Sequence, residues 1–93
     1  MNPELENLVK RAADILKKAG ATEVFVFGSA TTGQMRSDSD IDLAVSGLPP
    51  ELFFDSMAKT HAVLNRSLDL VDLDEQTPFT RYLKSKGRLL RVA

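Results

Sequence analysis

The sequence contains no cysteine, no tryptophan and only one histidine among its 93 residues. The absence of cysteine excludes disulfide-stapled mini-proteins, thiolate zinc sites and cysteine nucleophiles. No apolar run approaches the roughly 20 residues that span a bilayer, and the N-terminus lacks the apolar stretch of a signal peptide. The chain is therefore expected to be cytoplasmic and to make no contact with a membrane.

The length leaves room for one domain only, covering residues 1–93. A chain this short buries about two-thirds of the surface that its unfolded form exposes, so its core is expected to be thin. A two-domain enzyme with its own substrate lobe is excluded for this sequence. No repeat, low-complexity segment or internal linker interrupts the chain.

The net charge of −1 conceals an uneven distribution. Residues 1–75 carry 7 basic and 13 acidic side chains, whereas residues 76–93 carry five basic side chains and no acidic one. Such a basic segment on an acidic body suits a phosphate ligand, RNA or an acidic partner, but a solvated helix face with a basic C-terminal end is the simpler explanation. The overall balance argues against sequence-specific nucleic-acid binding, because dedicated nucleic-acid binders are usually basic throughout.

The hydrophobic pattern predicts helices and strands in a mixed order. Apolar residues at helical spacing predict three helices, over residues 3–18, 51–64 and from 77 to about 87. The last of these helices is expected to point Phe79, Tyr82 and Leu83 inward. Segments rich in β-branched and alternating apolar residues predict three strands, over residues 22–27, 40–45 and 67–73, with a further short strand or docked tail at 88–93. The predicted class is α/β (α+β): a small mixed sheet with helices packed mainly on one face.

Asp40 and Asp42 lie two residues apart on a predicted strand. Side chains alternate across a strand, so both carboxylates project from one face while Ile41 and Leu43 point into the core. If the third strand lies beside this one, Asp69 joins the two acids. Asp72 has the opposite parity in a regular strand, which is why Asp69 is preferred.

Three carboxylates at one edge of a sheet repel one another unless a pKa rises or a cation neutralises them. Oxygen ligands without histidine or cysteine favour Mg²⁺ or Mn²⁺ over zinc. Such ions bridge carboxylates to substrate phosphates and stabilise the leaving oxygens of a phosphoryl displacement. The sequence therefore predicts a metal site formed by Asp40, Asp42 and Asp69.

Gly28 and Ser29 follow the first predicted strand directly. Glycine lets an anion approach the backbone, and a serine hydroxyl can donate to a phosphate oxygen. Taken alone, Gly-Ser is more often a plain turn, and no Gly-Lys-Ser/Thr follows that would make a P-loop. The Gly28-Ser29 turn followed by Asp40 and Asp42 is a more specific sign of a phosphate-binding site than the turn or the acids alone.

Val26-Phe27-Gly28-Ser29, Gly33 and the run from Ser37 to Leu43 resemble the signature of the minimal nucleotidyltransferases, which belong to the DNA polymerase beta-like superfamily. Asp69 is similar to the later strand aspartate of that family. The resemblance covers nearly the whole chain and implies the nucleotidyltransferase fold. One departure is visible: relatives commonly carry arginines after Gly-Ser, where this chain has Ala30, Thr31 and Thr32.

The resemblance implies an activity and a set of roles. Gly28 and Ser29 would bind the triphosphate of an NTP, Asp40 and Asp42 would ligate Mg²⁺ (or Mn²⁺), and Asp69 would complete the metal site and help to activate the acceptor hydroxyl. The reaction would transfer a nucleoside monophosphate, AMP from ATP being the expected case, to a hydroxyl with loss of pyrophosphate.

The resemblance also implies a partner, because many minimal nucleotidyltransferases act as antitoxins of a HEPN-domain ribonuclease toxin, and some add AMP to a tyrosine of that toxin. A chain without a substrate lobe fits an acceptor that another protein supplies. Two alternatives stay open: an antitoxin that neutralises the toxin by complex formation alone, and transfer to a small molecule, for which known enzymes carry an additional helical domain.

Overall fold

A four-stranded mixed sheet organises the chain, as the sequence predicts. The computed structural model describes residues 3–28 and 40–93. Its helices are α1 (Pro3–Lys18), the 3₁₀ turn η1 (Pro50–Leu52), α3 (Phe53–Leu64) and α4 (Pro78–Ser85). Its strands are β1 (Glu23–Phe27), β2 (Ile41–Ser46), β3 (Leu68–Asp72) and β4 (Leu90–Arg91). The predicted class, a small mixed sheet with helices, is confirmed.

The strand order in the sheet is β3-β2-β1-β4. β1 runs antiparallel to both of its neighbours, β2 and β4, while β2 and β3 are parallel. A parallel pair needs a crossover connection, and α3 supplies it between β2 and β3. This arrangement places the starts of β2 and β3 beside the end of β1.

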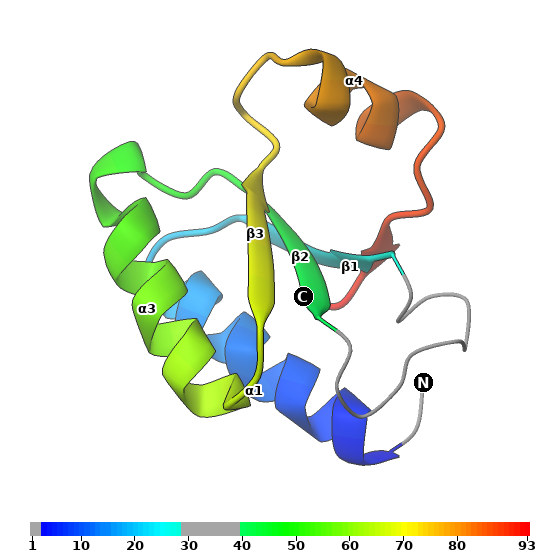
Figure 1. Ribbon diagram of the computed structural model, residues 1–93. Coiled ribbons are helices and arrows are strands. Elements are labelled where there is room, and N and C mark those ends of the chain that lie inside the picture. Colours follow the sequence, from blue (N-terminus) through cyan, green and yellow to red (C-terminus); the bar gives the residue numbers. More distant parts are fainter. Residues whose placement is uncertain (1–2, 29–39) are drawn as a thin grey trace.

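Helices α1 and α3 lie side by side and cover one face of the sheet (Figure 1). The apolar residues that α1 presents at helical spacing are buried there, among them Leu5, Val9 and Leu16. They pack against inward-facing strand residues, which are Val24, Val26, Ile41, Leu43, Val45 and Leu70. This cluster is the main core, and it fixes which face of each strand points away from it.

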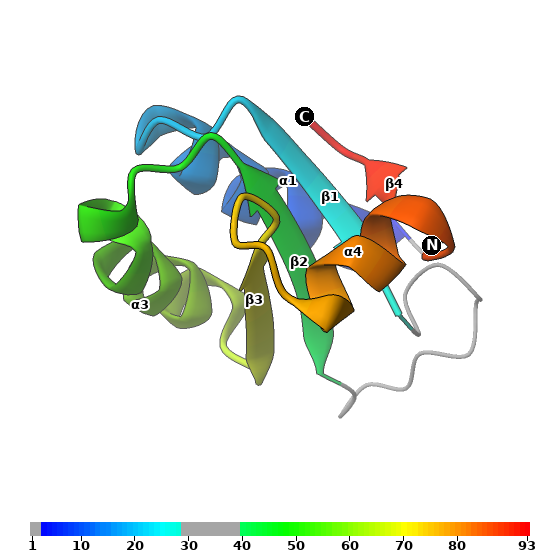
Figure 2. The ribbon, with the colours of Figure 1, turned by 90° about the horizontal axis from the view of Figure 1, so that it is seen from above.

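A smaller second core lies on the opposite face of the sheet. It consists of Phe27, Ala44, Leu73 and Leu83, with Leu83 contributed by α4. Figure 2 shows α4 and α1 on opposite sides of β1. The prediction that the helices pack mainly on one face therefore holds for α1 and α3, and α4 is the exception that shelters part of the other face.

The predicted inward orientation of Phe79 and Tyr82 on α4 is wrong. Their side chains are 47% and 56% exposed, and only Thr80 and Leu83 of this helix are buried. The reason is the size of the second core, because an eight-residue helix that covers three buried residues of other segments has one narrow stripe to bury. The two aromatic rings are therefore available at the surface.

The C-terminal segment forms a shorter strand than the predicted 88–93. Only Leu90 and Arg91 have strand geometry, and they pair with Val26 and Phe25. Beyond them, the backbone nitrogen of Val24 donates to the carbonyl oxygen of Ala93 at 3.0 Å. The tail is thus docked along β1.

Among the helices of residues 3–28 and 40–93, none has the length and hydrophobicity that a membrane span requires.

Helix α4 begins with a reciprocal cap, and its loss is expected to be measurable. The Thr77 hydroxyl accepts from the Thr80 backbone nitrogen at 3.1 Å, and the Thr80 hydroxyl accepts from the Thr77 backbone nitrogen at 3.0 Å. Thr77→Ala should lower stability by about 1 kcal/mol, which corresponds to a fall in melting temperature of about 4–8 °C. Thr77→Ser keeps the hydroxyl and should melt close to the wild type; equal losses in both variants would contradict the capping role.

Candidate functional site

Two aspartates lie side by side at the starts of the parallel strands. Asp42 on β2 is the register partner of Asp69 on β3, and on its other side Asp42 pairs with Phe27 of β1. Neighbouring strands are about 4.8 Å apart, and paired residues point to the same face. The three side chains therefore form one row across the sheet, in the order Asp69, Asp42, Phe27, on the face opposite α1 and α3.

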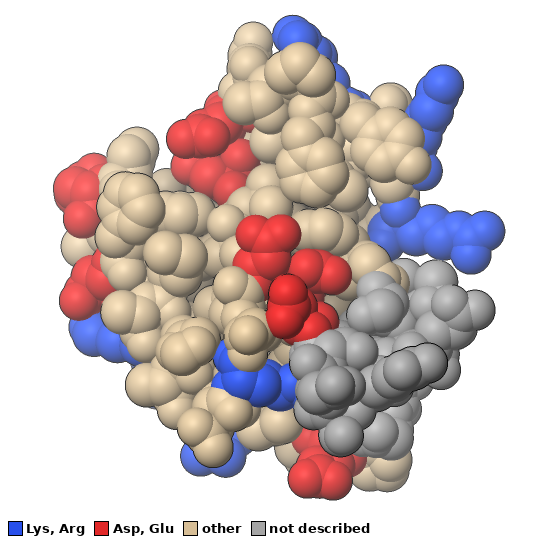
Figure 3. Space-filling view, viewed as in Figure 1, with Lys and Arg blue, Asp and Glu red and all other residues tan. Residues whose placement is uncertain are grey.

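Asp40 immediately precedes β2 and is exposed. Ile41 and Leu43 are fully buried in the main core, so the predicted alternation of acidic and apolar side chains along this strand is confirmed. Asp69 is also exposed, and Asp42 is partly buried. Figure 3, which has the viewpoint of Figure 1, shows acidic side chains gathered near the centre of the picture. A basic side chain lies directly below them, and others project at the top and on the right.

Gly28 directly follows β1 and contacts the Asp42 side chain. Its φ of +73° lies in the left-handed region, which side chains rarely adopt. A Cβ atom built on Gly28 would overlap the Asp42 Oδ2 atom and would lie 3.1 Å from its Cγ. Two reasons therefore require glycine at position 28: the left-handed backbone conformation, and the Asp42 carboxylate, which occupies the space that a Cβ atom would need.

Partial burial raises the pKa of Asp42 above its ordinary value, and the negative charges of Asp69 and then Asp40 raise it further. Both causes disfavour the ionised carboxylate. The row thus carries an electrostatic cost in the absence of a cation. Perturbed carboxylates of this kind are concentrated at functional sites.

The donor set fits a hard divalent cation. It consists of carboxylate oxygens alone, which favours Mg²⁺ or Mn²⁺, and a cation beside Asp42 would offset the repulsion that raises its pKa. Within residues 3–28 and 40–93, no three His, Cys, Asp or Glu side chains are already gathered in ligating positions. The carboxylates share one face and interact, and side-chain rotation would be needed to close them on an ion.

The raised pKa of Asp42 leads to a prediction about stability. A carboxyl group whose folded-state pKa lies above its unfolded value, here 3.8, favours folding when protonated. That benefit is present below pH 3.8 and is lost as the pH rises through the raised folded-state pKa. At neutral pH, Asp42→Asn should therefore stabilise the metal-free chain, by about 0.5 kcal/mol after allowing for solvent screening.

Thermal melting at two pH values tests this expectation. The gain should be about 2–4 °C at pH 7 and should vanish near pH 3, where the wild-type carboxyl is itself protonated. Asp55→Asn is a suitable control, because Asp55 pairs with Lys59 at 3.0 Å on exposed surface and should gain nothing. A melting temperature of Asp42→Asn below that of the wild type at pH 7 would show that the acidic row is not under electrostatic strain.

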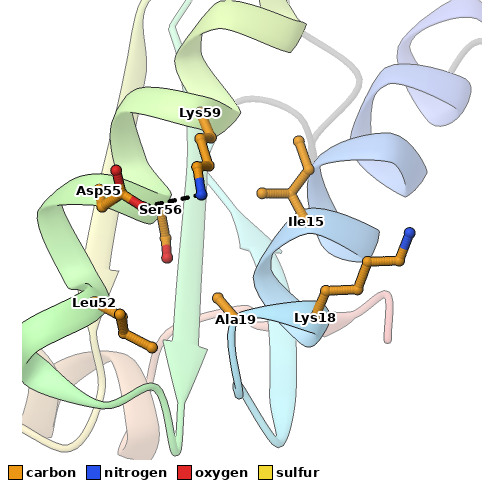
Figure 4. A pocket seen from close by; sticks show the side chains of 7 residues that line it. All are labelled: Ile15, Lys18, Ala19, Leu52, Asp55, Ser56 and Lys59. Carbon is orange, nitrogen blue, oxygen red and sulfur yellow. Dashed lines mark ion pairs between the residues drawn. The ribbon is translucent and has the colours of Figure 1, made fainter.

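A separate hollow lies between α1 and α3, on the side of the sheet away from the acids (Figure 4). Ile15, Ala19 and Leu52 give it an apolar lining, and the Asp55–Lys59 ion pair lies at its edge. None of the predicted site residues lines this hollow. It therefore belongs to the packing of the two helices rather than to the acidic row.

The structure brings together four of the five predicted site residues: Asp42, Asp69 and Gly28 directly, with Asp40 next to Asp42. Ser29, predicted to bind phosphate, lies outside the described residues, as does Gly33. Sequence reasoning did not single out Phe27, which completes the row and contacts the ring of Phe79 with centroids 6.2 Å apart. Its position directly before Gly28 was the available signal.

Comparison with known proteins gives a consistent assignment. Residues 9–92 match the family described as polymerase beta nucleotidyltransferase. A solved structure described as a toxin–antitoxin with AMP-PNP is 26% identical, with a TM-score of 0.68, over 90% of this chain and 70% of that one. Another, assigned as a minimal nucleotidyltransferase, is also 26% identical with a TM-score of 0.68, over 90% of this chain and 93% of that one.

A third solved structure, the MntA-HpeT toxin–antitoxin with a tyrosine replaced by alanine, is 25% identical with a TM-score of 0.66. The match covers 88% of this chain and 70% of that one. Among curated proteins, none matches the chain significantly.

Proposed function

The chain belongs to the polymerase beta nucleotidyltransferase family, and we propose that it transfers AMP from ATP to a tyrosine hydroxyl of a partner toxin, thereby acting as its antitoxin. The observation that carries this proposal is the row formed by Asp69 and Asp42, with Gly28 in contact with the Asp42 carboxylate. The proposed metal ligand Asp42 and the glycine turn that would admit a phosphate therefore lie in contact at one point of the sheet.

In this proposal, some of the site residues bind the metal and the others contact the substrates. Asp40 and Asp42 would hold Mg²⁺, which on binding supplies positive charge to the reacting phosphate. Gly28, together with Ser29, would let the triphosphate approach the backbone. Asp69 is exposed beside Asp42, where it can accept a hydrogen bond from an acceptor hydroxyl and orient it.

The proposed reaction is an in-line displacement at the α-phosphorus of ATP. A bond forms between the acceptor oxygen and the α-phosphorus, the bond from that phosphorus to the bridging oxygen breaks, and pyrophosphate leaves with the electron pair. The hydroxyl proton passes to a carboxylate or to solvent. Catalysis of this kind relies on positioning and charge rather than on a covalent intermediate, which suits a small site rich in acids.

The comparisons support a protein acceptor. Two of the similar structures are toxin–antitoxin complexes, one of them with AMP-PNP and another with a tyrosine replaced. We extend this to a HEPN-domain ribonuclease as the toxin. The described residues form one small sheet with three helices, and a partner would provide the walls around the acceptor.

The test is the intact mass of the partner. A HEPN-domain protein encoded beside this chain should gain the mass of one or more AMP groups when incubated with the chain, ATP and Mg²⁺. Replacing the modified tyrosine of the partner by phenylalanine should remove the adduct. No adduct with the wild-type pair, under conditions in which the two proteins form a complex, would contradict transfer to the partner.

The alternative is neutralisation by complex formation alone. The observation that favours it is the exposure of large aromatic side chains, since Phe54 is 74% exposed and Tyr82 is 56% exposed; such rings are common at protein interfaces. Under this alternative, the double variant Asp40→Asn/Asp42→Asn would still protect cells that express the toxin. Loss of protection in a folded double variant that still binds the toxin would exclude it.

A further inference from the structure

A groove runs from the end of β1 to the C-terminal end of α4, beside the acidic row. Its volume is about 370 Å³, within the range of about 300–1,000 Å³ that is typical of small-molecule sites. Three aromatic residues, two cationic residues and one glycine are among its lining residues: Phe27, Phe79, Tyr82, Lys86, Arg88 and Gly28.

The groove is continuous with the acidic row at Gly28. This residue lines the groove and also contacts Asp42, and the preceding Phe27 is the register partner of Asp42. A ligand that fills the groove as far as Gly28 would therefore reach the Asp42 carboxylate.

Two α4 side chains and the residue that follows the helix line the groove. Phe79 and Tyr82 lie three residues apart, which places them on the same side of α4. Lys86 caps the C-terminal end of α4 and lines the same groove. The two rings are about half exposed, and Phe79 contacts Phe27, another lining residue, edge to face. Exposed rings on a groove wall provide flat surface for a planar ligand.

The cations are available for an anionic ligand. In the part of the chain that the structure describes, Lys86 and Arg88 form no ion pair; the pairs present involve Lys10, Lys59 and Arg91. Both side chains are exposed and lie on one groove, where cations of one sign raise the local concentration of anions. Arginine in particular binds phosphate oxygens through two parallel hydrogen bonds.

We propose that this groove is the nucleotide site and that Lys86 and Arg88 bind the phosphates of the nucleoside triphosphate. The inference rests on the proposed function, which requires such a substrate, and it adds Lys86 and Arg88 to the residues that would bind the triphosphate beside Gly28. It also gives a role to the basic C-terminal segment of an otherwise acidic chain. A ligand with a planar base and several negative charges matches the aromatic walls and the cations together.

Titration calorimetry with three probes tests the assignment: ATP with Mg²⁺, tripolyphosphate with Mg²⁺, and adenosine. Lys86→Gln/Arg88→Gln should weaken binding of ATP and of tripolyphosphate by about 10- to 100-fold, since each lost charge-assisted hydrogen bond corresponds to roughly tenfold in affinity. Adenosine, which has no phosphate, should be affected less than about twofold on the same reasoning.

Arg81→Gln/Lys84→Gln is the matched control. It removes the same charge from α4, shortly before Lys86 and Arg88 in the sequence, but neither residue lines the groove, so ATP affinity should change by less than about threefold through long-range charge alone. Melting curves of both double variants establish that each is folded. Equal losses in the two double variants, or no loss in either, would overturn the assignment.

The outcomes separate this inference from the proposed function. If ATP binds the wild type and Lys86→Gln/Arg88→Gln equally well, the groove assignment is wrong and the transfer proposal stands. If ATP binding depends on Lys86 and Arg88 but the partner gains no AMP, the groove assignment holds and the acceptor proposal falls. If the wild type binds no ATP with Mg²⁺, both are wrong.

Discussion

Asp42→Asn is expected to lower the rate of nucleotidyl transfer by about 1,000-fold or more without unfolding the chain. Asp42 occupies the middle of the row, with Asp69 on one side and Phe27 and Gly28 on the other. Removing its charge takes away a ligand from the proposed metal, whose stabilisation of the reacting phosphate is worth several kcal/mol. A loss of about 4 kcal/mol corresponds to the expected factor.

The readout is the initial rate of AMP incorporation into the partner at saturating ATP, with melting temperature measured in parallel. Because Asn leaves the shape of the side chain unchanged and relieves like-charge repulsion, the variant should melt at or above the wild-type temperature at pH 7. Low activity with a raised melting temperature is a combination that damage to the fold does not produce.

Asp72→Asn provides the matched control. Asp72 lies on the same strand as Asp69 but three residues further along, so it has the opposite parity and sits outside the row. Its carboxylate accepts from the Asp74 backbone nitrogen at 2.9 Å, and the Asn oxygen can accept that bond as well. The activity of Asp72→Asn is expected to lie within about threefold of the wild type on this parity argument.

If Asp42→Asn retained more than a tenth of the wild-type activity, the proposed metal-binding role of the row would be wrong.

Much of the acidic row could be predicted because strand alternation is a local property. Ile41 and Leu43 had to be buried for β2 to contribute to a core, and this alone directs Asp40 and Asp42 to the other face. The structure agrees, since both apolar residues are fully buried. A one-residue change of register would have exchanged the two faces.

The position of Asp69 depends on which strands pair with one another, and the sequence alone does not determine that pairing. Parity places Asp69 on the right face if β3 lies beside β2, but the parallel register of Asp42 with Asp69 is set by the crossover through α3. Main-core packing decides that crossover, through contacts such as Leu64 against the sheet residues. Non-local packing of this kind has no signature within either strand.

Helical periodicity wrongly predicted that Phe79 and Tyr82 of α4 are buried. Phe79, Tyr82 and Leu83 are all apolar and fall on neighbouring positions of α4, so their pattern favours burial of all three. Beneath α4, Leu83 packs with Phe27, Ala44 and Leu73 in the small second core. The rings then remain at the groove, where exposure of apolar area is a sign of binding rather than of packing.

Gly28→Ala is expected to lower transfer activity by about 100-fold and also to destabilise the chain. The new methyl group would overlap the Asp42 carboxylate and would sit on a backbone with φ of +73°. Displacing a catalytic group by about 1 Å can cost about 100-fold in rate. The left-handed conformation adds about 1 kcal/mol of strain for alanine, a fall of about 4–8 °C in melting temperature.

A double-variant cycle separates the two contributions to stability. In an Asp42→Gly background the carboxylate is absent, so Gly28→Ala should cost only the backbone strain and less than it costs in the wild type. The difference between the two costs measures the contact between residue 28 and the Asp42 side chain. Equal costs in both backgrounds would mean that the methyl group does not meet the carboxylate, and the predicted loss of activity would then have no steric cause.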